Sequence, residues 1–141
     1  MYVYFLRANG KPKRLKIGKA KDPMARLKTL QTGCPFQIVF AGVLKCKDDA
    51  HAMRVEKAFH AYFAMHRQQG EWFNCTDEIL ANMWVVLDKI QQVGSEIKVL
   101  TAKEMSELYY GKDSKINHAV AGYFAPKNWK HRISASKRIA T

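Results

Sequence analysis

Three polar residues near the start of the chain have types that suit chemistry on a phosphodiester. Tyr4 ends the string Tyr2-Val3-Tyr4, Lys16 opens Lys16-Ile17-Gly18, and Arg26 follows that glycine by eight residues. A tyrosine and a second polar group could line a phosphodiester if the fold brings them to an arginine, whose planar fork donates hydrogen bonds to phosphate oxygens. The combination predicts cleavage of nucleic acid.

A fourth and a fifth candidate follow on one expected helix. Glu56 and His60 are four residues apart, so their side chains can point toward one site. Phosphodiester cleavage needs a nucleophilic water, a group that takes its proton, a cation near the phosphorus and help for the leaving oxygen. His60 either shuttles a proton or hydrogen-bonds a phosphate, and the competing interpretation is a packed or solvated helix histidine.

Local patterns predict the elements that must position these residues. Residues 2–7 alternate in strand fashion, and a turn rich in glycine and proline leads to a second strand over 15–18. Asp22 and Pro23 mark the start of a helix over 23–31, with Asp22 as cap and Pro23 at the first position. Residues 36–44 are apolar enough for a third, central strand.

A long helix is expected next, beginning at Asp48-Asp49 and running to about Arg67, with Gly70 ending it. Its core-facing residues are expected to be Val55, Phe59, Tyr62 and Phe63. An extended segment over 71–75 and a helix beginning at Thr76 complete the unit. We expect an α+β fold, with a small mixed sheet made of the hairpin plus the third strand, flanked by helices.

Composition favours a soluble protein that meets a polyanion. The 141 residues include 24 Lys or Arg and 12 Asp or Glu, for a net charge of +12. Such a balance favours contact with phosphates through counterion release, although a basic protein can also be merely soluble or bind acidic lipids. No apolar run reaches the length of a membrane-spanning helix, and no export signal is expected, which predicts the cytoplasm. Three cysteines without close spacing predict neither a disulfide framework nor a zinc site.

The strings described above resemble the GIY-YIG nuclease superfamily. The likeness is to a phage and bacterial branch that has a Lys-Ile-Gly second motif, a segment like the one at 26–33, a glutamate-bearing helix, and then Gly-Glu-Trp-Phe, found here at 70–73. These features appear in order over residues 2–75. Two positions depart from the family name, since Tyr2 replaces its glycine and Lys16 replaces its second tyrosine.

The resemblance implies a role for each candidate. Tyr4 would orient or activate water, Arg26 would bind the phosphate oxygens, and Glu56 would hold a single Mg²⁺ or Mn²⁺ as the sole strong protein ligand. Lys16 would act as a base if neutral, or otherwise as a phosphate clamp. The implied setting is the cytoplasm of a bacterium or of a phage-infected host.

The C-terminal part predicts an additional DNA-binding element. We expect a nuclease domain over 1–92 and a basic helical tail over 97–141, in which 101–120 weakly resembles a helix-turn-helix; a solvated helical hairpin is the alternative. The expected DNA contacts lie in both parts of the chain: Lys19, Lys21, Lys115, Asn117, Lys127, Lys130 and Arg132.

Two functions of different class therefore follow from the sequence. The first is a divalent-metal-dependent DNA endonuclease that cleaves by water attack. The second is a DNA-binding regulator that has kept the nuclease fold without its chemistry. Tyr4, Arg26 and Glu56 together favour the first, because a pure scaffold has little need of all three.

Overall fold

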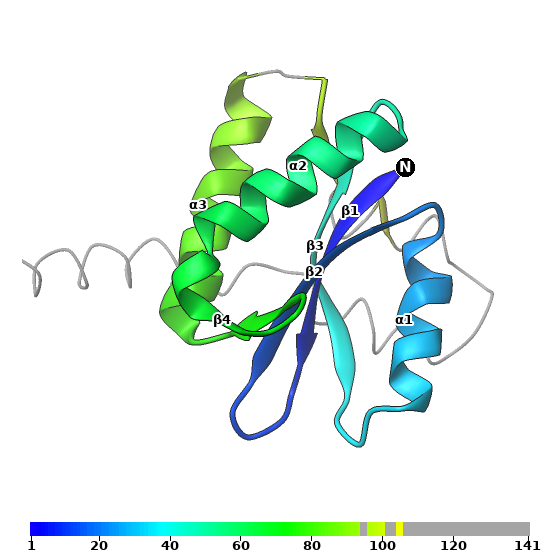
Figure 1. Cartoon of the computed structure of the whole chain (residues 1–141). Helices are drawn as coiled ribbons and strands as arrows, with labels where there is room; N and C mark the ends of the chain where they lie inside the picture. Colours follow the sequence, from blue (N-terminus) through cyan, green and yellow to red (C-terminus); the bar gives the residue numbers. More distant parts are fainter. Residues whose placement is uncertain (94–95, 101–103, 106–141) are drawn as a thin grey trace, which may run out of the picture.

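The computed structural model describes residues 1–93, 96–100 and 104–105, and in this part of the chain it shows a single antiparallel sheet with helices on both faces. The strand order is β4-β5-β2-β1-β3-β6. Helix α1 covers one face, whereas α2 and α3 cover the other (Figure 1). The elements are β1 (Tyr2–Ala8), β2 (Arg14–Ala20), α1 (Pro23–Thr32), β3 (Ile38–Lys45), α2 (Asp49–Tyr62), a 3-10 turn (Ala64–His66), β4 (Arg67–Gln69), β5 (Trp72–Asn74), α3 (Asp77–Val93) and β6 (Lys98–Val99).

The α+β class is confirmed, and the sheet is larger than expected. Each of the expected three strands is present, and β5 lies within the extended segment expected over 71–75. The short strands β4 and β6 were not expected, and every pairing among the described strands is antiparallel. The β1–β2 hairpin is in register from Tyr2 opposite Ala20 to Ala8 opposite Arg14. Tyr4 therefore lies directly opposite Gly18, on the face of the sheet that α1 covers.

Helix starts follow the predicted capping residues. The Asp22 side chain accepts a hydrogen bond from the Ala25 amide at 3.1 Å, and Pro23 occupies the first turn of α1. Asp48 caps α2 through the His51 amide at 2.7 Å, and Thr76 caps α3 through the Ile79 amide at 3.2 Å. These caps fix the entry points of the helices, including the one that carries Arg26.

The predicted end of α2 is wrong. The helix ends at Tyr62, not near Arg67, and residues 67–69 form β4, which pairs with β5. Strand hydrogen bonds formed in the tertiary structure outweigh the helical preference of this stretch. Gly70 ends no helix; it has φ of 56° and forms the β4–β5 turn, a left-handed conformation that glycine adopts at little cost.

Tyr62 is also placed differently from the prediction. Its side chain was expected in the core, but 58 % of Tyr62 is exposed, whereas the adjacent Phe63 is 2 % exposed. The chain turns at Phe63 after the last helical residue, so Phe63 alone enters the core at this end of α2.

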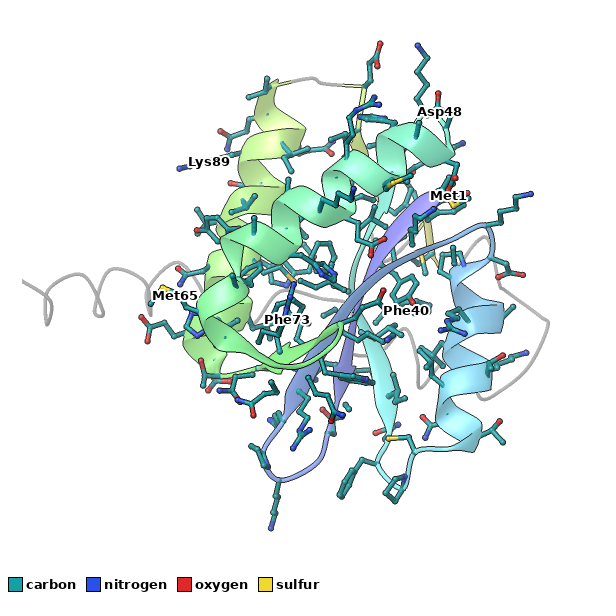
Figure 2. The ribbon with its side chains drawn as sticks, viewed as in Figure 1. Met1, Phe40, Asp48, Met65, Phe73 and Lys89 are labelled. Carbon is teal, nitrogen blue, oxygen red and sulfur yellow. The ribbon has the colours of Figure 1, made fainter. Side chains whose placement is uncertain are left out.

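The sheet separates two hydrophobic cores, marked by Phe73 and Phe40 in Figure 2. Phe73 belongs to the larger core under α2 and α3, and Phe40 belongs to the smaller core under α1. The smaller core includes Leu100 and Met105, and β6 pairs with β3, so the described residues after 96 pack on the same sheet. None of the helices in the described ranges is long and apolar enough to cross a membrane.

Candidate functional site

The candidate site lies at the edge of β2, beyond the point where its pairing with β5 stops. The β2–β5 ladder covers only residues 14–16 of β2, and one further backbone hydrogen bond joins Ile17 N–H to Glu71 O at 3.3 Å. Helix α2 packs on β2 from the other face of the sheet. Side chains of α2 and of the β4–β5 turn can therefore reach the same place as those on the α1 face.

Tyr4 and Arg26 are in direct contact across the α1 face. Tyr4 is 2 % exposed, while Arg26 lies on an exposed position of α1 and donates a side-chain hydrogen bond to the Tyr4 hydroxyl. Strand β1 and the first turns of α1 thus present a phenol and a guanidinium as a pair. The guanidinium keeps further N–H donors for another acceptor, such as a phosphate oxygen.

Gly18 makes room for the Tyr4 ring. A Cβ atom added to Gly18 would lie 2.4 Å from the Tyr4 hydroxyl oxygen and 2.6 Å from the ring carbon that bears it. Such contacts are too short for the two groups to coexist. The glycine of the Lys16-Ile17-Gly18 string is therefore needed for the close approach of the aromatic ring to the strand.

We expect Gly18→Ala to destabilise the protein by about 1–3 kcal/mol, the usual cost of overpacking a filled site. The Tyr4 ring is buried and lies against Gly18, so it must shift to admit the methyl group. The measurement is urea unfolding. Gly33→Ala is the matched control, because no atom lies within 4 Å of a Cβ added there, and its stability should change by less than about 0.5 kcal/mol. Equal stabilities for the two variants would contradict the expectation.

Two carboxyl groups from different elements meet beside this pair. The carboxyl groups of Glu56 on α2 and Glu71 in the β4–β5 turn lie within hydrogen-bond reach of each other, and the charge of each carboxylate reaches Tyr4. The Glu56 side chain is 15 % exposed and the Glu71 side chain 43 % exposed. Lys16 Nζ forms an ion pair with Glu71 at 3.0 Å and lies 5.3 Å from the centre of the Trp72 ring.

His60 is fixed at both ring nitrogens. Its Nε2 lies 2.8 Å from the Ile17 carbonyl oxygen, and its Nδ1 lies 3.3 Å from Nη2 of Arg67. A carbonyl only accepts and a guanidinium only donates, so these contacts require Nε2 to carry the proton and Nδ1 to accept. Nε2 is 3.7 Å from a Glu56 carboxylate oxygen. His60 thereby links α2 to the β2 edge, next to the glutamate.

Burial and charge shift the acidities of two site residues. Burial raises the pKa of the Tyr4 hydroxyl, with the Glu71 and Glu56 charges acting in the same direction against the hydrogen bond and charge of Arg26. Burial also raises the pKa of the Glu56 carboxyl, and the neighbouring Glu71 charge adds to this effect, while His60 and Lys19 oppose it. Tyr4 is therefore a neutral phenol at neutral pH, and Glu56 binds its proton more tightly than an ordinary glutamate.

The donor set is compatible with a hard divalent cation. The Glu56 carboxylate could provide an oxygen ligand, and a cation there would offset the Glu71 charge that, after burial, raises the Glu56 pKa. Among the described residues, no group of three or more His, Cys, Asp or Glu is arranged to hold a metal.

The structure places only some of the predicted site residues. It brings together Tyr4, Lys16, Arg26, Glu56 and His60 at the β2 edge, as the geometry above describes. Lys19 is nearby but forms an ion pair with Asp49, and Lys21 is exposed just before α1. The remaining predicted DNA contacts lie outside the described residues: Lys115, Asn117, Lys127, Lys130 and Arg132.

Two neighbours of the site were not among the predicted site residues. Glu71 lies within the Gly-Glu-Trp-Phe string, and its place in that string was the sequence feature that could have indicated a role at the site. Arg67 was expected at the end of a helix, and no local pattern shows that it belongs to a strand that returns to His60.

A comparison with protein-family models identifies the family of this chain. The T5orf172 domain matches residues 1–98, which is more than half of the sequence and includes every described site residue. The chain belongs to the T5orf172 domain family. This family is GIY-YIG-like and nuclease-associated, so the expected resemblance is confirmed at that level. No curated protein and no solved structure matches the chain.

Membership in the T5orf172 family indicates a nuclease-like or DNA-binding domain. The T5orf172 match ends at residue 98, the first residue of β6, so it extends to the last strand of the sheet.

Proposed function

We propose that this T5orf172 protein is a divalent-metal-dependent DNA endonuclease that hydrolyses a phosphodiester bond by water attack. The observation that supports this most is the convergence of Tyr4, Arg26 and Glu56 from β1, α1 and α2 at one site. Tyr4 also packs in the smaller core, whereas Arg26 is exposed on α1. Together the three residues supply a hydroxyl to orient water, donors for a phosphate and a carboxylate for a cation.

Arg26 binds the phosphate and Tyr4 orients the water. The guanidinium offers its remaining N–H groups to the non-bridging oxygens, where negative charge grows in the transition state. The raised pKa of Tyr4 keeps its proton in place at neutral pH, so the phenol acts by hydrogen bonding instead of removing a proton. Their direct contact fixes the distance between the water site and the phosphate site.

Lys16 and Glu71 act as a charged pair. The ion pair at 3.0 Å presents Lys16 as a cation, which suits a clamp on the phosphate better than a base. Glu71 is the more exposed of the two carboxylates and accepts the proton of the attacking water. His60, held at both nitrogens, positions α2 against β2 and keeps Glu56 at the site.

Glu56 is the residue that would hold Mg²⁺ or Mn²⁺. When bound, such an ion offsets charge on the phosphate and on the leaving oxygen. The net charge of +12 favours DNA as the substrate class, and Lys19, near the end of β2, and Lys21, just before α1, are the described cations that we expect to contact its backbone.

The cleavage rate should fall as the pH is lowered through the raised pKa of Glu56, because its carboxylate must be ionised to hold the cation.

Glu71→Gln is expected to slow cleavage by about 100-fold, at the low end of what a general base contributes. The same variant should move the acid limb of the residual rate to lower pH, because it removes the charge that helps to raise the Glu56 pKa. A pH–rate profile of both proteins measures this, and an unmoved or raised acid limb would count against the assignment.

The proposed activity is tested with supercoiled plasmid, incubated with the full chain in Mg²⁺, in Mn²⁺ and in EDTA. Conversion to nicked or linear DNA with either metal, and none in EDTA, is the expected result. A gel-shift assay in EDTA provides the comparison with the rival function. Protein that shifts DNA but leaves it intact with each metal would instead indicate the catalytically inactive DNA-binding regulator.

A further inference from the structure

A groove lies on the α1 face, next to the proposed active site. It has a volume of about 660 Å³ and is bounded by the β1–β2 loop, the second half of α1, the α1–β3 loop and β5. This volume falls within the range of pockets that hold small ligands, about 300–1,000 Å³. The residues that define its chemistry are Lys11, Arg14, Leu30, Cys34, Phe36 and Trp72.

The groove and the proposed active site lie on the same face of the sheet, at different points along β2. Arg14, Lys16 and Gly18 alternate on β2 opposite Ala8, Leu6 and Tyr4 of β1, so all three face α1. At about 3.3 Å per residue, Arg14 lies roughly 13 Å along the strand from Gly18. Trp72 joins the two regions, because it lines the groove and also lies beneath the Lys16 ammonium.

The aromatic wall of the groove is held in place before any ligand arrives. Phe36 is 48 % exposed, and its ring packs on the β1–β2 loop so closely that a Cβ added to Gly10 would lie 2.9 Å away. Gln31 fixes the loop from α1: its Nε2 donates to the Phe36 carbonyl at 2.9 Å, and its Oε1 accepts from the Ile38 amide at 2.7 Å. An exposed ring fixed in this way keeps little conformational freedom to lose on binding.

Charge in the groove favours an anionic ligand. Lys11 and Arg14 are exposed cations on its rim, and no carboxylate is among the described residues that line it. A flat aromatic face beside a guanidinium is the arrangement that binds a nucleotide, whose base stacks while its phosphate is neutralised. A volume of about 660 Å³ is of the size that holds one small ligand, such as a nucleotide.

We propose that this groove is a subsite for an unpaired nucleotide of the DNA strand that passes the active site, with the base stacked on Phe36 and Trp72 and the phosphate on Arg14. The proposal rests on the proposed function for its choice of DNA and extends it to the substrate class: DNA with a base that is single-stranded or turned out of the helix next to the cleaved bond.

Binding of fluorescein-labelled single-stranded (dT)8 to the full chain in EDTA, measured by anisotropy, tests the subsite without any cleavage. Phe36→Leu keeps apolar volume against Gly10 but removes the aromatic face. It is expected to weaken binding by roughly 5- to 160-fold, the range for losing one base–aromatic stack. Tyr62→Leu is the matched control, since Tyr62 is a more exposed aromatic residue at the far end of α2, and it should leave the affinity unchanged.

An abasic strand of the same length separates stacking from phosphate contact. The Phe36→Leu effect should disappear on the abasic strand, whereas Arg14→Gln should weaken binding to both strands. The proposal is overturned if Phe36→Leu binds (dT)8 within twofold of wild type, or if it loses the abasic strand equally. If either of these results is found and the protein still cleaves plasmid DNA, the subsite is rejected and the nuclease proposal stands. If binding depends on Phe36 but no metal supports cleavage, the subsite stands and the nuclease proposal is rejected.

Discussion

Glu56→Gln is expected to abolish metal-dependent cleavage of plasmid DNA, with a loss of at least about 1,000-fold in rate. The amide keeps the size and shape of the carboxyl group but removes the charge that would hold the divalent ion. Loss of a metal at a phosphate costs several kcal/mol of transition-state stabilisation, and each 1.36 kcal/mol is a factor of ten. The rate of supercoiled plasmid loss in Mg²⁺ and in Mn²⁺ is the measurement.

The same substitution should not weaken the metal-free fold. The Glu56 pKa is raised in the folded protein, so the folded state binds this proton more tightly than the unfolded chain. The stability that Glu56 contributes is present below its pKa in the unfolded chain and is lost as the pH rises through its raised pKa in the folded protein. At neutral pH the ionised carboxylate therefore lowers the free energy of unfolding. In EDTA at neutral pH, the Tm of Glu56→Gln should equal or exceed that of wild type, which excludes misfolding as the cause of lost activity.

Metal binding without DNA provides an independent reading of the same site. At a concentration 100 times its Kd, a ligand of the native state stabilises it by about 2.7 kcal/mol. Mn²⁺ should therefore raise the Tm of wild type and not that of Glu56→Gln. Glu96→Gln, at an exposed position away from the site, should behave as wild type. An equal Mn²⁺ shift in all three proteins would place the ion elsewhere.

Elements with strong local signals were predictable from the sequence. The hairpin, α1, β3 and the start of α3 depend on alternation, on a proline after Asp22 and on the capping hydroxyl of Thr76, all of which act within a few residues. The prediction that Glu56 and His60 share one helix face also follows from local periodicity, and their 3.7 Å separation agrees with it.

Features that depend on pairing between distant segments were not predictable in the same way. Residues 64–69 carry no signal against a helix, and β4 forms only because β5 is available as its partner. The same hairpin brings Glu71 to Glu56 and Arg67 to His60. Two charged residues near the site, Arg67 and Glu71, thus depend on a turn at Gly70 that forms only when β4 pairs with β5.

The role of Gly18 also depends on pairing with another strand, although the motif that contains it was recognised in the sequence. The Lys16-Ile17-Gly18 string was recognisable as a motif, yet its residues gave no reason for the glycine. That reason is the register that places Gly18 opposite Tyr4, where the ring lies against the strand. The sequence can therefore identify a motif position such as Gly18, but the reason why glycine is required there depends on the residue opposite it on the partner strand.

Arg26→Ala is the second substitution with a large expected effect, and it should lower the cleavage rate by about 100- to 1,000-fold, the usual cost of removing one donor that stabilises a developing negative charge. DNA affinity in EDTA should change little, because a protein with a net charge of +12 has many other contacts to phosphate. Arg26 also lowers the Tyr4 pKa, so this pKa should rise further in the variant. An NMR titration of ¹³Cζ-labelled tyrosine measures that change separately from activity.

Two neighbouring variants decide whether the guanidinium itself matters. Lys28→Ala removes an exposed cation two residues along α1 and should leave the rate unchanged. Arg26→Lys keeps the charge but loses the planar fork, so it should recover only part of the lost rate, because a point charge cannot bind Tyr4 and a phosphate oxygen in the same fixed geometry. If Arg26→Lys recovers the full rate, only the charge of Arg26 matters. If Arg26→Ala loses as much DNA affinity as cleavage rate, Arg26 is an ordinary contact to the DNA backbone.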